Sequence, residues 1–129
     1  MIVVDSGVWI DYFNGTVTPE TDRLDAYLDQ QLLLVGDLML TEVLQGFRDD
    51  RDHNAARVAL LHLLVEPIVG TDIALRSAEN YRTLRRRGVT VRKTIDCLIA
   101  TFCLENGHQL LFSDRDFQPF VDHLGLETA

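Results

Sequence analysis

Cysteine is scarce in this chain of 129 residues, and its two cysteines are poorly placed to pair. Cys97 and Cys103 lie six positions apart in a segment with a helical pattern, which separates their Cα atoms by about 9 Å. An unstrained disulfide needs a shorter Cα–Cα distance. Neither cysteine has metal-ligand spacing to a histidine. The pattern indicates buried thiols in a reducing compartment and argues against a disulfide scaffold.

Long apolar runs, repeats, linkers and low-complexity segments are also missing. No stretch approaches the roughly 20 apolar residues of a membrane span. The first residues, 1–5, lack the basic region of a signal peptide, so we expect a cytoplasmic protein that does not bind membranes. The hydrophobic fraction of 47% and the charged fraction of 25% exclude global disorder. The length fits one domain, residues 1–129.

Basic residues are few, and Lys93 is the only lysine. Twelve Lys and Arg residues against 20 Asp and Glu residues give a net charge of -8. This balance excludes non-specific nucleic-acid binding through overall positive charge. It leaves a nucleic-acid substrate open, because metal ions and a local basic patch can reverse the field near a site. It also suits a basic protein partner.

Short apolar segments alternate with amphipathic helical patterns, which predicts an α/β fold. We expect one domain with a mainly parallel sheet of four to five short strands flanked by helices. Asp37 and Thr94 are expected to cap the helices 38–48 and 95–105. Gly88 is expected to end the helix 72–87, and Gly107 the helix 95–105. The predicted strands are 2–4, 32–35, 68–69 and 109–112, and the predicted helices are 6–13, 19–30, 38–48, 54–64, 72–87, 95–105 and 117–124.

Acidic residues follow two of the predicted strands. Asp5 comes directly after the first apolar run, and Asp114 follows the last, with Asp116 close behind. Carboxyl ends of parallel strands meet at one edge of a sheet, where ligands bind. If these two strands are neighbours, both carboxylates reach one crevice. Each residue could instead cap the helix that follows it.

Two further acids fall inside helical patterns. Asp96 lies in the first turn after Thr94, where the helix dipole favours an acid, yet its neighbours are apolar. A buried carboxylate needs a partner or a metal ion. Glu42 lies beside an apolar arc and, taken alone, would belong to a solvated face. Together with Asp5 and Asp114, these residues could surround one spot.

Gathered carboxylates need a counter-cation. Two of them about 4 Å apart repel by about 4 kcal/mol at an effective dielectric near 20. Hard oxygen ligands of this kind suit Mg²⁺ or Mn²⁺. The sequence thus predicts a metal-dependent enzyme that cleaves phosphodiesters, with Asp5, Glu42, Asp96 and Asp114 as the catalytic, metal-binding quartet.

At four places the chain resembles the PIN-domain ribonucleases, and within them the VapC-type toxins of bacterial toxin–antitoxin pairs. The matching segments, in order, are Val4-Asp5-Ser6-Gly7-Val8-Trp9-Ile10-Asp11, Leu40-Thr41-Glu42-Val43-Leu44-Gln45-Gly46, Lys93-Thr94-Ile95-Asp96-Cys97-Leu98-Ile99-Ala100 and Leu111-Phe112-Ser113-Asp114-Arg115-Asp116-Phe117.

The resemblance implies a metal-dependent endoribonuclease in which Asp5, Glu42, Asp96 and Asp114 bind Mg²⁺ or Mn²⁺. Asp116 matches an additional acid of the family. The resemblance also implies an RNA substrate, a cognate VapB-type antitoxin and a homodimer. Ser6 and Ser113 match hydroxyl positions next to the first and last acids, from which hydrogen bonds orient ligands.

The arginines and lysine nearest the acids are candidates for guiding RNA. Arg92 and Lys93 immediately precede the Asp96 turn and could contact a phosphate. An alternative reading is an acidic binding module that catalyses nothing, and another is a different metal-dependent phosphohydrolase. A receiver-like domain is disfavoured because Lys93 precedes a helix rather than ending a strand. A haloacid-dehalogenase-type phosphatase is disfavoured because Gly7 stands where its second Asp would be.

Overall fold

One parallel sheet lies at the centre of the computed structural model, which describes residues 1–30 and 32–129. Its strands follow the order β3-β2-β1-β4, and every pairing is parallel. The strands are β1 (Ile2–Val4), β2 (Leu33–Gly36), β3 (Leu64–Glu66) and β4 (Gln109–Leu111). The predicted α/β class is confirmed.

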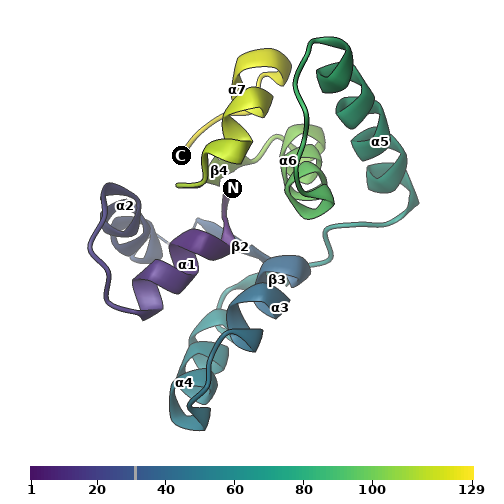
Figure 1. The fold of residues 1–129 in the computed structure, drawn as a ribbon. Helices are drawn as coiled ribbons and strands as arrows, with labels where there is room; N and C mark the ends of the chain where they lie inside the picture. Colours follow the sequence, from purple (N-terminus) through teal and green to yellow (C-terminus); the bar gives the residue numbers. More distant parts are fainter. Residues whose placement is uncertain (31) are drawn as a thin grey trace.

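Helices cover both faces of the sheet (Figure 1). The α3–α4 pair projects away from α5, α6 and α7, with the sheet between the two groups. The helices are α1 (Ser6–Phe13), α2 (Pro19–Leu28), α3 (Asp37–Gln45), α4 (Asp50–Leu61), α5 (Thr71–Arg86), α6 (Thr94–Asn106) and α7 (Gln118–Leu124), with a 3₁₀ turn η1 (Arg115–Phe117). None of these helices is long and apolar enough to cross a membrane.

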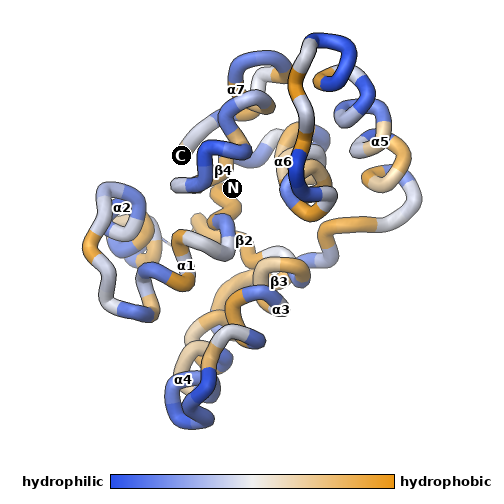
Figure 2. Tube along the Cα trace, viewed as in Figure 1, coloured by the Kyte–Doolittle hydropathy of each residue, from blue (hydrophilic) through white to orange (hydrophobic). Residues whose placement is uncertain are grey.

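Alternation along the strands divides the core into two clusters. Val3 of β1 and Leu34 of β2 point into one, which α5, α6 and α7 cover. Val4 and Val35 point into the other, beneath α1, α2, α3 and α4. This is the period of two that a strand imposes on side chains, here with both faces buried. Figure 2 shows the hydrophobic residues concentrated in the central strands and in α6.

The third strand lies earlier in the chain than its predicted position at 68–69. It ends at Glu66, directly before Pro67, because proline has no N–H to donate to a strand ladder. Ile68 is instead buried in the linker that follows, where its N–H donates to the Asp37 carboxylate over 3.0 Å. Asp37 therefore connects this linker to the start of α3.

Several helix ends also differ from the sequence prediction. Helix α4 begins at Asp50, capped by the Asp49 side chain, which accepts the Arg51 N–H, and not at residue 54. The N-cap residues of α3 and α6 are Gly36 and Lys93 rather than Asp37 and Thr94. Polar residues at helix starts satisfy the first N–H groups from more than one position, so the residue type alone does not fix the boundary.

Gly36 is required at the junction of β2 and α3, and this gives a first testable prediction. A Cβ added there would lie 2.5 Å from Ile68 Cγ1 and 2.8 Å from Met39 Cε, both in fully buried side chains. We expect Gly36→Ala to lower the free energy of unfolding by about 1–3 kcal/mol through overpacking. Thermal denaturation would show a melting temperature lower by roughly 5 °C or more.

Gly46 provides the matched control for this substitution. Its φ of -80° suits alanine, and the nearest atoms to an added Cβ are backbone oxygens at 3.6 and 3.9 Å. Gly46→Ala should leave the melting temperature almost unchanged. Equal destabilisation by both variants would contradict the close approach at Gly36.

Candidate metal centre

The ends of two neighbouring strands, β1 and β4, place Asp5 and Asp114 at the same edge of the sheet. Strands β1 and β4 are neighbours, and the Asp5 N–H donates to the Leu111 carbonyl over 2.9 Å. Asp5 is the residue after β1 and Asp114 lies three residues beyond β4. The condition set from the sequence, that these two strands are neighbours, is therefore met.

Asp96 is the acid that helix α6 contributes. It lies in the first turn of α6, is only 7% exposed, and is flanked by the buried Cys97 and Ile99. Its Oδ2 is buried and has no hydrogen-bond partner among the described residues. A carboxylate oxygen in this state needs a cation, since burial without a partner is costly.

Three carboxylates form the tightest acidic group. Asp96, Asp114 and Asp116 each offer an oxygen, and these oxygens all lie within 4.8 Å of one another. The chain between the last two acids is held in place because Asp114 Oδ1 accepts the Asp116 N–H over 2.9 Å. The other Asp114 oxygen, Oδ2, lies 3.7 Å from Lys93 Nζ.

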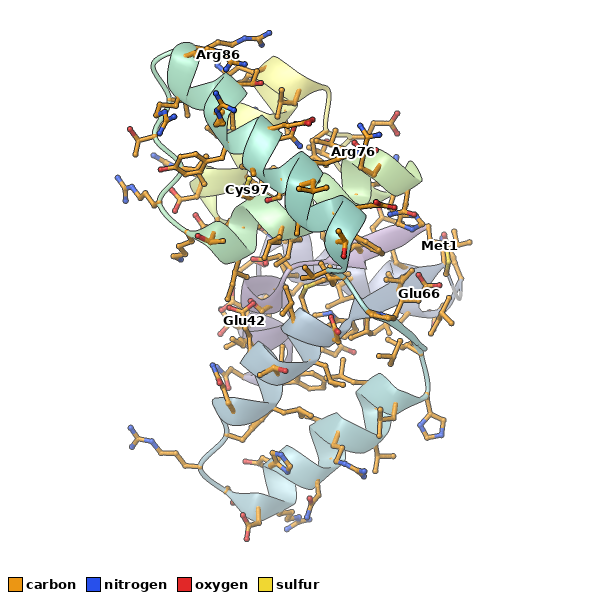
Figure 3. All side chains as sticks on the ribbon, turned by 90° about the vertical axis from the view of Figure 1, so that its right-hand side faces the viewer. Met1, Glu42, Glu66, Arg76, Arg86 and Cys97 are labelled. Carbon is orange, nitrogen blue, oxygen red and sulfur yellow. The ribbon has the colours of Figure 1, made fainter. Side chains whose placement is uncertain are left out.

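Asp5 and Glu42 lie outside that group, but they interact with it through their charges. The charge of Asp96 raises the pKa of Asp5, and the charge of Glu42 raises the pKa of both Asp5 and Asp96. Glu42 is half-buried on α3, and Figure 3 places it at the waist of the molecule, between α4 and helices α5 and α6. Of the five acids singled out from the sequence, the structure therefore groups Asp96, Asp114 and Asp116, and the charges of Asp5 and Glu42 act on or respond to that group.

The carboxyl groups of Asp5 and Asp96 release their protons at a higher pH than a free aspartate does. Burial, followed by the charge of Asp96, raises the pKa of Asp5 from 3.8 to about 7, although the Gly7 and Ser6 amides oppose the rise. Burial raises the pKa of Asp96 to about 6; Lys93 opposes the rise, while Asp114, Asp116 and Glu42 add to it. Carboxyl groups that titrate near neutral pH mark a functional site more often than a structural one.

Lys93 supplies the nearest positive charge. Its Nζ lies 3.7 Å from Asp114 Oδ2, and the charges of Asp96 and Asp114 raise its pKa. The side chain is exposed and free to move. Lys93, predicted as an RNA contact, thus lies at the acidic group, where it offsets part of the repulsion.

The other residues predicted for the site are Ser6, Ser113 and Arg92. Ser6 is half-buried and Ser113 is exposed. Within the described residues, neither hydroxyl hydrogen-bonds to an acid, so their proposed orienting role stays a prediction. Arg92 lines a small cavity beside Asp96. Arg115 lines the same cavity and was missed from the sequence, although its place between Asp114 and Asp116 could have revealed it.

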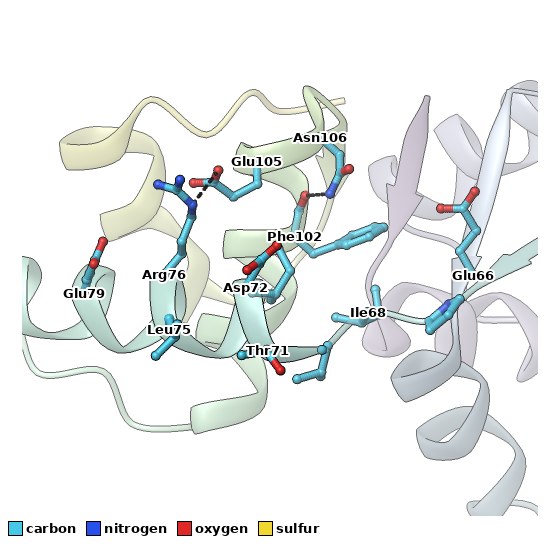
Figure 4. Close-up of a pocket in the computed structure, with 14 residues that line it drawn as sticks. Glu66, Ile68, Thr71, Asp72, Leu75, Arg76, Glu79, Phe102, Glu105 and Asn106 are labelled. Atoms are coloured by element: carbon cyan, nitrogen blue, oxygen red, sulfur yellow. Dashed lines mark hydrogen bonds and ion pairs between the residues drawn. The ribbon is translucent and has the colours of Figure 1, made fainter.

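The largest hollow lies elsewhere, between the β3–α5 linker and the C-terminal half of α6 (Figure 4). It measures about 910 Å³ and contains none of the five acids. Two polar contacts already occupy its wall: Arg76 pairs with Glu105 at 3.3 Å, and the Asn106 side chain donates to the Phe102 carbonyl. We place the site at the acids because the carboxylate oxygens of Asp96, Asp114 and Asp116 lie within 4.8 Å of one another there.

The acidic group has the chemistry of a divalent metal site. It combines several carboxylate oxygens, one of them buried and unpartnered, with pKa values raised in the absence of an ion. Oxygen-only ligands of this kind select hard cations. The described residues could therefore hold a divalent ion through Asp96, Asp114 and Asp116, with Asp5 and Glu42 adjoining.

Comparison with known proteins agrees with this geometry. The model of the PIN domain matches residues 2–120. The chain is 30% identical to VapC ribonuclease Mb1587 of Mycobacterium bovis and to ribonuclease VapC11 of Mycobacterium tuberculosis. Each alignment covers 100% of this chain and 98% of the relative.

Solved structures share the fold over nearly the full length. VapBC2 from Rickettsia felis, bound to a promoter DNA fragment, aligns with a TM-score of 0.78 and 14% identity over 100% of this chain and 98% of that one. FitAcB from Neisseria gonorrhoeae aligns with a TM-score of 0.75 and 16% identity over 99% and 96%. With the family model covering almost the whole sequence and the acids gathered at one sheet edge, this chain belongs to the PIN domain family.

Proposed function

We propose that this protein is a metal-dependent endoribonuclease and the toxin of a VapBC-type toxin–antitoxin pair. The observation that carries the proposal is the close approach of the Asp96, Asp114 and Asp116 carboxylates, together with the buried Asp96 Oδ2 that has no hydrogen-bond partner among the described residues. The relatives named as VapC ribonucleases support RNA as the substrate. The similarity to toxin–antitoxin complexes, including one from Klebsiella pneumoniae with a TM-score of 0.72, supports the fold on which the proposal rests.

We expect the five acids to contribute unequally to binding the cofactor, Mg²⁺ or Mn²⁺. Asp96, Asp114 and Asp116 would bind it most directly, with Asp5 and Glu42 completing the negative wall. When bound, such an ion lowers the pKa of a coordinated water and offsets charge on a phosphodiester. The buried position of Asp5 and Asp96 excludes bulk water from their oxygens, which strengthens their attraction for a cation.

Cleavage of RNA by the purified protein tests this proposal. Freed of any partner protein and mixed with total RNA, it should release discrete fragments with Mg²⁺ or Mn²⁺ and none with EDTA. Asp50→Asn, which neutralises an exposed acid at the start of α4, should cleave at the normal rate and thereby control for charge. An alternative, the inactive acidic binding module, would be favoured by metal binding without cleavage across several RNA pools.

A protein partner follows from the same proposal. We expect a VapB-type antitoxin, encoded beside this chain, to bind it in the cytoplasm and suppress cleavage. The net charge of -8 favours a partner segment rich in basic residues. Co-expression with the neighbouring reading frame should yield a complex without RNase activity, and separating the two in denaturant should restore it. The homodimer stays a prediction, which light scattering on the isolated protein would test.

A further inference from the structure

A small cavity borders the acidic group on the side of the α5–α6 linker. It measures about 70 Å³, and Asp96 and Asp116 form its acidic wall. Arg92 comes from the linker and Arg115 from η1, so both arginines line the same space. The remaining wall is Val89, Thr90, Val91, Pro119 and Phe120.

Both arginines are available to a ligand. Within residues 1–30 and 32–129, neither guanidinium forms a salt bridge or a hydrogen bond. Several other arginines near the end of α5 are engaged: Arg87 donates to the His123 carbonyl over 2.9 Å, and Arg85 lies over the Tyr81 ring. In a chain where acids outnumber bases by 20 to 12, two unpaired arginines beside two acids point to a ligand that is itself negative.

Building on the proposed function, we infer that this cavity is a subsite for an RNA phosphate adjacent to the one that is cleaved. The negatively charged part of an RNA strand is its phosphate backbone. Guanidinium groups bind phosphate oxygens through paired, charge-assisted hydrogen bonds. The subsite would hold the backbone of the substrate against a surface that otherwise repels it.

This placement has a physical consequence for the substrate. An RNA strand that approaches five carboxylates meets repulsion on all sides except where cations offset it. Arg92 and Arg115 contribute positive charge at the cavity beside these acids. The contact is to the backbone, so it sets the register of the strand and carries no sequence preference.

Kinetics on short RNA substrates test the subsite. Arg115→Ala and Arg92→Ala should each raise KM by about tenfold, the loss typical of a charged hydrogen bond to phosphate, with kcat changed much less. Arg115→Lys should recover only part of this loss because lysine lacks the planar fork. Arg85→Ala, which removes an equal charge outside the cavity, should change KM less than twofold. Equal effects from all three alanine variants would overturn the subsite in favour of general electrostatics.

Phosphate binding separates this inference from the proposed activity. Inorganic phosphate, titrated into the Mg²⁺-saturated protein, should shift the guanidinium NMR signals of Arg92 and Arg115, and Arg115→Ala should weaken its binding by about tenfold. If the wild type cleaves no RNA yet these signals respond, the phosphate subsite stands and the ribonuclease proposal fails. If the wild type cleaves RNA but these signals and KM are insensitive, the subsite is wrong and the ribonuclease proposal stands.

Discussion

Replacing Asp96 with asparagine should abolish measurable RNA cleavage while making the metal-free protein more stable. Asparagine keeps the size of the side chain but removes the charge from the buried, unpartnered Oδ2. Partners that merely orient a metal ligand are worth about 10- to 100-fold in affinity or activity, so loss of a ligand should lower kcat/KM by at least about 100-fold. Asp114 and Asp116 would be left without their central neighbour.

The gain in stability has the same cause as the loss of activity. Burial and three neighbouring acids disfavour the ionised form of Asp96, so a neutral side chain relieves that penalty. Opposite effects on activity and stability are typical of a site maintained for function. An acid that only stabilises the start of α6 through its charge would behave differently, because neutralising it would destabilise the fold by about 0.3–1 kcal/mol.

Two measurements check this prediction together. Initial cleavage rates with Mn²⁺ give the loss of activity, and thermal denaturation in EDTA gives the change in stability. Asp50→Asn, on α4, supplies the control for both, with activity and melting temperature near those of the wild type. A lower melting temperature for Asp96→Asn in EDTA would reassign Asp96 to a structural role.

The sequence placed candidate site residues correctly in the fold where the residue type and its position after a strand or within a helix indicated the same role. Val3 and Val4 indicate a buried strand. Asp5 follows them directly and must therefore lie at the carboxyl edge of the sheet. Asp96 stood out because a charge within an apolar helix is costly. Glu42 taken alone indicated a solvated face and was included because it could converge with the other acids and matches the family pattern. Its half-burial depends on the packing of α3 against α1 and the sheet, which is distant in sequence.

The misplaced strand and the overlooked arginine have different causes. The sequence around β3 (Leu64–Glu66) has no alternating pattern that marks it as a strand. It forms a strand because it pairs with β2, a tertiary contact that no local pattern encodes. Arg115 lines a cavity that joins two segments, residues 89–96 and 115–120, which the fold brings together. The only local indication of its role is its position between Asp114 and Asp116, because the cavity itself arises from packing.

The metal-free protein should lose stability as the pH rises from 5 to 8, and a divalent ion should restore it. In the unfolded chain, aspartates release their protons near pH 3.8, whereas folding raises the pKa of Asp5 to about 7 and that of Asp96 to about 6. Between these values the folded state binds more protons than the unfolded state, so its stability falls with increasing pH. The rise at Asp5 alone corresponds to on the order of 4 kcal/mol above pH 7.

A bound ion replaces those protons as the counter-charge. Saturating Mg²⁺ or Mn²⁺ should therefore raise the melting temperature by on the order of 10 °C at pH 8. The effect should be much smaller at pH 5, where protons compete with the ion. His108 contributes a slope of the opposite sign, because burial and the N-terminal charge lower its pKa. Its ring is exposed enough for this contribution to be small.

Thermal denaturation at several pH values, with EDTA or with added metal, measures both effects. The double variant Asp5→Asn/Asp96→Asn is the matched control, since it lacks the two carboxyl groups whose pKa values rise into this range. Its melting temperature should vary little between pH 5 and 8 and respond weakly to metal. Metal-free wild type that is more stable at pH 8 than at pH 5 would show that the carboxylates are not crowded in solution. Because the proton and the ion compete for the same oxygens, the pH at which stabilisation by metal appears should follow the titration of Asp5 and Asp96.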